Sequence, residues 1–189
     1  AHFVNVLTAA LALAGFYCYV FVYTRWLKRS SPQNIVIGGA AGAFPPLVGW
    51  AGVTGRVDLA SVFLFLIVFY WTPPHFWALA LNKQVDYGRA GVPMAPLVWG
   101  ERETINQMLW YSVLLVALTV LPACIGTFGV VYLVSALTLG GLLVWGVWRV
   151  RAAQAGGTWS KPAWWVYKYS LLYLALLFVA MVVDRHLTF

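Results

Sequence analysis

The sequence predicts an all-α fold, a polytopic bundle of six transmembrane helices that forms a single membrane domain over residues 1–189. Hydrophobic residues make up 62% of the chain, charged residues only 9%, and the mean hydropathy is +0.81. A soluble domain of this length could not cover so much apolar surface. The apolar runs are continuous rather than alternating, which is typical of spanning helices and argues against a transmembrane barrel.

Six runs approach the roughly 20 apolar residues that a spanning helix needs. The second run holds small residues at positions 38–42, which allow close helix approach, followed by Pro45 and Pro46. The third contains Pro73 and Pro74. Each proline lacks an N–H group, so we expect both helices to break at these pairs and to line a central cavity. A very short turn joins the fourth and fifth runs as an antiparallel hairpin. The expected spans are 1–23, 35–53, 59–81, 108–125, 128–148 and 164–183.

The distribution of charge predicts the orientation of the bundle. The formal net charge is +7, and ten of the 12 Lys and Arg residues follow the first, third and fifth runs. Basic loops favour the cytoplasmic or matrix side, and basic residues between apolar runs do not indicate nucleic-acid binding. The composition, rich in Ala, Gly and Trp, favours a bacterial plasma (inner) membrane over the mitochondrial inner membrane. Cys18 and Cys124 are isolated in apolar runs and show no metal-ligand spacing.

The polar segment after the third run carries most of the candidate chemistry. Asn82 and Asp86 are four residues apart, so they share a face if the helix continues. Asp86 would then lie near a helix C-terminus, where a bound cation offsets an unfavourable dipole. Mg²⁺ is often held by one or two carboxylates with substrate phosphates, and Lys83 and Arg89 suit a diphosphate. Alternatively, Asp86 pairs with Lys83 or Arg89 as a structural clamp.

A histidine and three basic residues are further candidates. His75 follows Pro73 and Pro74, where it faces a substrate or is an interior histidine that hydrogen-bonds to a freed carbonyl. On the same predicted side, the first helix is followed by three basic residues that serve as phosphate contacts or as topology anchors. These residues are Arg25, Lys28 and Arg29.

Three motifs together resemble the protoheme IX farnesyltransferase (heme O synthase) family of UbiA-type intramembrane prenyltransferases. They are YTRWLKRSSPQNIVIGGAAGAFPPLVGWAGVTG, WTPPHFWALAL and DYGRAGVPM, and the resemblance extends over essentially the whole chain. It implies nine helices around a cavity open to the cytoplasm and the membrane. It also implies Mg²⁺-dependent transfer of the farnesyl group of farnesyl diphosphate to a vinyl group of heme B, giving heme O. Heme B is then a substrate, the lipid bilayer surrounds the enzyme, and heme A synthase is a downstream partner.

The resemblance also implies roles for individual residues. Asp86 belongs to the second of two aspartate motifs that hold Mg²⁺ and the diphosphate, and His75 occupies the family's Pro-His position, where it is a candidate for contacting heme. The expected catalytic residues are Asp86, Lys83 and Arg89, with Asp86 also the metal ligand, and the expected substrate-binding residues are His75, Tyr87, Asn82, Lys28, Arg29 and Arg25.

One departure from the family pattern limits the expected activity. The first aspartate motif is absent from this sequence, and the chain begins at Ala1 in what resembles the family's fourth helix. We therefore expect a C-terminal fragment without three helices, inactive by itself. Alternatives are a UbiA-type enzyme acting on an aromatic quinone precursor, a non-enzymatic heme-binding membrane subunit and a transporter. The last is weakened because the spans lack acidic residues for a coupling ion.

Overall fold

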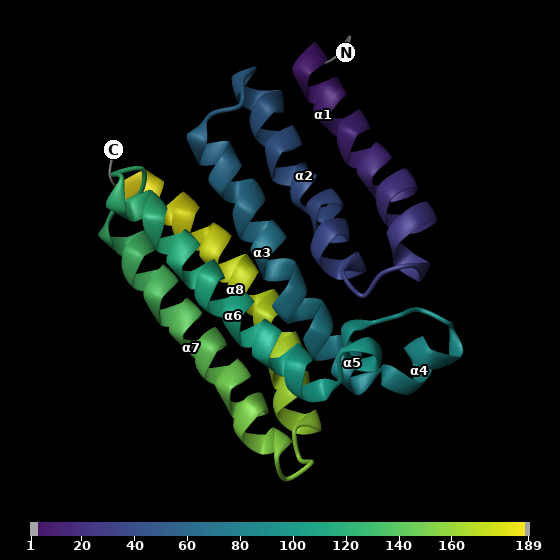
Figure 1. Cartoon of the computed structure of the whole chain (residues 1–189). Coiled ribbons are helices and arrows are strands. Elements are labelled where there is room, and N and C mark those ends of the chain that lie inside the picture. Colours follow the sequence, from purple (N-terminus) through teal and green to yellow (C-terminus); the bar gives the residue numbers. More distant parts are fainter. Residues whose placement is uncertain (1–3, 188–189) are drawn as a thin grey trace.

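The computed structural model describes residues 4–187 and is helical throughout (Figure 1). The first span begins as an α-helix and then becomes a wider and finally a tighter helix. The elements are α1 (Val6–Tyr17), the π-helix η1 (Cys18–Trp26), the 3₁₀-helix η2 (Leu27–Arg29), α2 (Asn34–Thr54), α3 (Leu59–Asn82), α4 (Gln84–Arg89), α5 (Ala95–Val98), α6 (Glu101–Cys124), α7 (Val130–Gln154) and α8 (Ser160–Leu187).

Six helices in the described part of the chain are long and apolar enough to cross a membrane, which confirms the predicted fold class. The start of the first expected span, residues 1–3, lies outside the described residues. The fourth span begins at Glu101, seven residues before its expected start. Gly100 has a φ of 81°, which glycine adopts readily, and Glu101 and Glu103 in the first turn favour a helix N-terminus.

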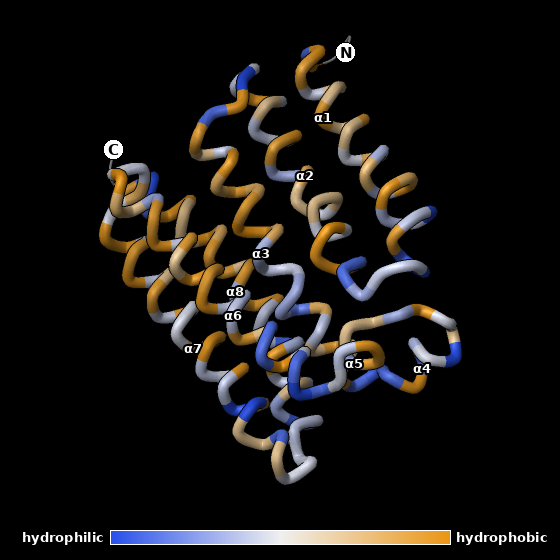
Figure 2. The backbone as a smooth tube through the Cα atoms, in the orientation of Figure 1, coloured by the Kyte–Doolittle hydropathy of each residue, from blue (hydrophilic) through white to orange (hydrophobic). Residues whose placement is uncertain are grey.

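Helix α3 lies at the centre of the bundle, with α2 on one side and α6 and α8 on the other (Figure 1). Helix α7 packs against α6 and α8, and α1 packs against α2. The helix midsections are apolar, whereas polar residues gather at the ends and around α4 (Figure 2). The largest fully buried side chains, Trp77, Tyr132 and Tyr173, belong to α3, α7 and α8.

The expected breaks at the two proline pairs are wrong, because α2 and α3 run continuously through them. Membrane helices tolerate proline where they pack against neighbouring helices. Beside the proline pair of α3, the Trp71 indole donates to the carbonyl of Ser170 on α8. The irregular helix is instead η1, which no proline or glycine marks in the sequence.

A buried carboxylate links the end of α8 to the start of α7. Asp184, only 1% exposed, accepts hydrogen bonds from the backbone N–H groups of Gly129 and Tyr132. These N–H groups begin α7 and have no partner within that helix. An α8 side chain therefore caps α7 and fixes the turn between α6 and α7.

Candidate functional site

Helix α3 ends at Asn82, and the chain turns before Asp86. Lys83 has φ −117° and ψ 22°, and α4 starts at Gln84. Asn82 holds this end, since its amide nitrogen donates to the carbonyl of Ala78 and its amide oxygen accepts from the Ser160 hydroxyl on α8. The predicted shared helix face of Asn82 and Asp86 is therefore wrong.

The expected position of Asp86 at a helix C-terminus is also wrong, because Asp86 lies in the first turn of α4. Negative charge is favourable at a helix N-terminus, so the dipole favours the Asp86 carboxylate rather than opposing it. Lys83 Nζ lies 3.1 Å from Asp86 Oδ2, and both side chains are largely exposed. Within residues 4–187 it is thus Lys83, rather than Arg89, that pairs with Asp86, as in the structural-clamp alternative.

Sequence reasoning missed one carboxylate beside this loop. Glu101 Oε1 at the start of α6 accepts a hydrogen bond of 2.9 Å from the amide of Gln84. The contact joins residues 17 positions apart, and no local spacing in the sequence indicates it. In the described chain, no group of three His, Cys, Asp or Glu side chains could hold a metal ion. The magnesium half-site predicted at Asp86 stays a prediction.

Tyr87 follows Asp86 and turns its phenol toward the bundle. Burial raises the pKa of Tyr87, and the nearby phenol of Tyr167 and carboxylate of Asp86 raise it further, whereas Lys83 lowers it. The phenol therefore stays protonated at neutral pH and is a hydrogen-bond donor beside the Lys83–Asp86 pair.

A cavity of about 450 Å³ opens between η1, α2 and α3. Tyr19 and Tyr23 line it from η1, and Lys28 is the basic residue at its edge. One wall is the small-residue face of α2. Two glycines of this face, Gly38 and Gly39, lie against Tyr23 and Thr72, as predicted for close helix approach. The opposite wall is the α3 segment that contains Trp71, Thr72 and Phe76.

His75 lies behind this α3 wall and is 6% exposed. Its Nδ1 atom is 2.7 Å from the Ser170 hydroxyl on α8. The ring stacks on Trp71, at 4.3 Å between ring centroids, and on Tyr167, at 4.8 Å. The structure thus places His75 as a hydrogen-bonded interior histidine, with a hydroxyl partner rather than the freed carbonyl that we expected.

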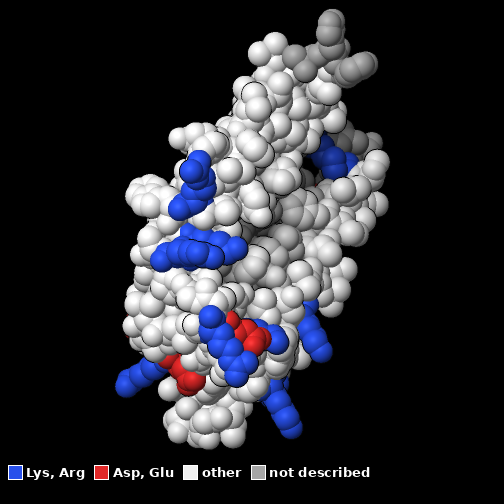
Figure 3. All heavy atoms as spheres, turned by 90° about the vertical axis from the view of Figure 1, so that its right-hand side faces the viewer, with Lys and Arg blue, Asp and Glu red and all other residues white. Residues whose placement is uncertain are grey.

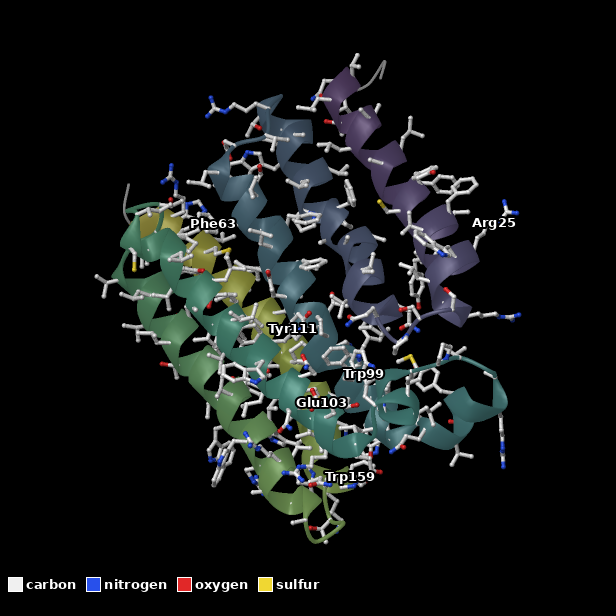
Figure 4. The ribbon with its side chains drawn as sticks, viewed as in Figure 1. Arg25, Phe63, Trp99, Glu103, Tyr111 and Trp159 are labelled. Atoms are coloured by element: carbon white, nitrogen blue, oxygen red, sulfur yellow. The ribbon has the colours of Figure 1, made fainter. Side chains whose placement is uncertain are left out.

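The basic residues after the first helix do not converge on one point. Lys28 lines the cavity, whereas Arg25 points away from the bundle in Figure 4 and lies 5.9 Å from the ring of Phe21. Arg29 is exposed at the end of η2. Figure 3 shows basic side chains spread along this face of the molecule rather than in one patch.

The close contact between η1 and α2 yields a testable prediction. A Cβ atom on Gly38 would overlap the ring of Tyr23, so we expect Gly38→Ala to destabilise the protein by about 1–3 kcal/mol. Thermal unfolding in detergent measures the effect. The matched control is Gly49→Ala on the same helix, where a Cβ atom meets nothing within 4 Å. Equal unfolding temperatures for the two variants would contradict this close packing.

The chain is similar to known proteins of one family. The model of the UbiA prenyltransferase family matches residues 1–172. The protoheme IX farnesyltransferase of Roseiflexus sp. (strain RS-1) is 60% identical over 98% of this chain and 34% of its own length. Those of Chloroflexus aurantiacus and Granulibacter bethesdensis are 56% and 54% identical over 97% and 96% of this chain, and 30% and 59% of their own lengths.

The chain thus spans between 30% and 61% of the length of such curated relatives. A solved structure of digeranylgeranylglyceryl phosphate synthase shares the fold, with a TM-score of 0.75 over 97% of this chain and 63% of the other, at 18% identity. This likeness shows the fold, whereas the family follows from the family model, which covers residues 1–172 of the 189. The chain belongs to the UbiA prenyltransferase family.

Proposed function

We propose that this chain provides part of the active site of a protoheme IX farnesyltransferase, which transfers the farnesyl group of farnesyl diphosphate to a vinyl group of heme B and forms heme O. The observation that carries the proposal is the 60% identity, over 98% of this chain, to the Roseiflexus enzyme of that name. The geometry supports it, because an apolar cavity with a lysine at its edge lies at the same end of the bundle as the Lys83–Asp86 loop.

In this proposal the polar end of the site handles the diphosphate. Lys28, Lys83 and Arg89 neutralise the leaving diphosphate as the allylic C–O bond breaks. Asp86 would hold Mg²⁺, which when bound supplies further positive charge to the diphosphate. Lys83 pairs with Asp86 in the free protein. If Asp86 held Mg²⁺, the Lys83 ammonium would be available to contact the diphosphate. A single carboxylate holds Mg²⁺ weakly, so we expect this chain by itself to have little activity.

The apolar end of the proposed site protects the farnesyl cation. The α2 and α3 walls exclude water, so that the vinyl carbon of heme is the first nucleophile to meet the cation. A C–C bond then forms to the terminal vinyl carbon, and the positive charge moves to the carbon beside the porphyrin ring. Water adds to that carbon and loses a proton, which leaves the hydroxyl group of heme O. Tyr87 and Asn82 orient substrate as hydrogen-bonding groups near the entrance.

We also propose an orientation and a place in heme metabolism. Ten of the 12 Lys and Arg residues lie in the loops and helix ends at the Asp86 end of the bundle, which favours a cytoplasmic position for that end in a bacterial inner membrane. Heme O would then pass to heme A synthase, the expected downstream partner.

The test is an assay in detergent with heme B, farnesyl diphosphate and Mg²⁺, read by mass for heme O. It is run on this chain and on a chimera in which the chain replaces the matching segment of the Roseiflexus enzyme. We expect product from the chimera and little from the chain. A folded chimera without product would overturn the proposal and lead to aromatic quinone precursors as the next substrates.

The place of His75 beside the cavity wall yields a second prediction. We expect His75→Ala in the chimera to weaken heme B binding about tenfold and to change farnesyl diphosphate binding less, because the imidazole supports the aromatic wall. Equilibrium titrations of each substrate measure this. Ser170→Ala is the control, since it removes the hydrogen bond to the ring and keeps the ring. Equal heme affinity in His75→Ala and the parent would restrict His75 to a structural role.

A further inference from the structure

A second cavity lies at the opposite end of the bundle from the Asp86 loop. It has a volume of about 520 Å³ and lies where the start of α3 and the end of α8 diverge. The volume falls in the range of ordinary ligand sites. The proposed prenyl transfer uses none of the residues that line this cavity.

The rim of this cavity is basic. Arg56 and Arg185 line it, and they are the two Lys or Arg residues that lie outside the basic end of the bundle. Asp58 also lines the rim and pairs with Arg56, with Oδ2 at 3.5 Å from Nε, while Oδ1 accepts from the N–H of Ser61 at the start of α3. His186 adds a third nitrogen-bearing side chain.

The inner part of the cavity is apolar. Its walls include Leu64 from α3 and Phe178, Met181 and Val182 from α8. Trp50 from α2 also lines the cavity. A ligand with an anionic head and a hydrocarbon tail would fit the arginines of the rim and the apolar walls together.

We propose that this cavity binds an anionic phospholipid, with its phosphate between Arg56 and Arg185 and one acyl chain along α3 and α8. The position favours a lipid over a water-soluble anion, because helix ends are where lipid headgroups meet a transmembrane bundle. The proposal does not depend on prenyl transfer, since the two cavities lie at opposite ends of the bundle.

Native mass spectrometry of the detergent-purified protein tests the proposal, with phosphatidylglycerol and phosphatidylcholine of identical chains as probes. We expect phosphatidylglycerol to bind about fivefold more tightly, and Arg56→Gln to remove that preference. Arg151→Gln, at the opposite end of the bundle, is the matched control and should keep it. Val182→Trp fills the apolar part from a position that is 58% exposed, and should weaken binding of both lipids without disturbing the core.

Three results would overturn the assignment. Equal binding of the two lipids by the parent would remove the role of the charged rim. Full displacement of phosphatidylglycerol by inorganic phosphate would indicate a headgroup site without an acyl chain. Displacement by heme B, with heme binding weakened in Arg56→Gln, would reassign the cavity to the proposed substrate.

Discussion

Asp86→Asn in the chimera with the Roseiflexus segment is expected to reduce heme O formation by about 10²–10³-fold, the loss typical of removing one group that stabilises developing charge. Asn keeps the size of Asp86 but cannot supply the negative charge that holds Mg²⁺. Folding should survive, because the Lys83–Asp86 pair is exposed and such pairs contribute about 1 kcal/mol or less. The measurement is the initial rate of product formation by mass, beside a thermal unfolding curve.

One control variant separates the role of Asp86 from general changes in charge, and a second variant tests its pairing with Lys83. Glu103→Gln removes a carboxylate from the exposed first turn of α6, at the same end of the bundle, and should leave the rate within about twofold, as for a surface change. Lys83→Met removes the partner of Asp86 and should raise the affinity of the free protein for Mg²⁺. A full rate for Asp86→Asn would exclude Asp86 as a metal ligand.

The six spans were predictable because the bilayer leaves few choices to a long apolar run. Each run must satisfy its own backbone hydrogen bonds, so hydropathy and length alone indicate a helix. Local rules were less reliable for the prolines. Pro73 and Pro74 do not interrupt α3, which packs against α2, α6 and α8 and is linked to α8 by the Trp71 indole. Helix propensity carries no information about support from a neighbouring helix.

The geometry of the candidate loop was only partly predictable. The clamp between Lys83 and Asp86, derived as an alternative from spacing, is present, whereas a role of these residues in binding phosphate and metal stays a prediction. The predicted direction of the helix dipole at Asp86 was wrong, because the chain turns at Lys83 and Asp86 lies in the first turn of α4. Just before that turn, Asn82 accepts a hydrogen bond from Ser160, which lies 78 residues away in the sequence. The hydrogen bond between His75 and Ser170 likewise spans 95 residues, and one sequence without an alignment contains no signal for it.

Asp184→Asn is expected to lower the free energy of unfolding by about 2–3 kcal/mol, because buried donors that lose their acceptor carry the full cost of desolvation. Asp184 accepts from the N–H groups of both Gly129 and Tyr132. Asn has one acceptor oxygen, so its NH₂ group would face the other donor. The unfolding temperature in detergent should fall by roughly 4–12 °C.

Asp58→Asn is the matched control, since Asp58 also caps a helix of the same bundle. The Asp58 side chain is 30% exposed and the Asp184 residue only 1%, so water can replace the lost hydrogen bond at the start of α3 but not at the start of α7. We expect a loss of about 1 kcal/mol or less for Asp58→Asn, the lower part of the range for capping residues. Equal losses for the two variants would mean that burial between helices does not set the strength of the Asp184 cap. A difference of several degrees in unfolding temperature would instead identify the contact from α8 to the start of α7 as a principal link at this end of the bundle.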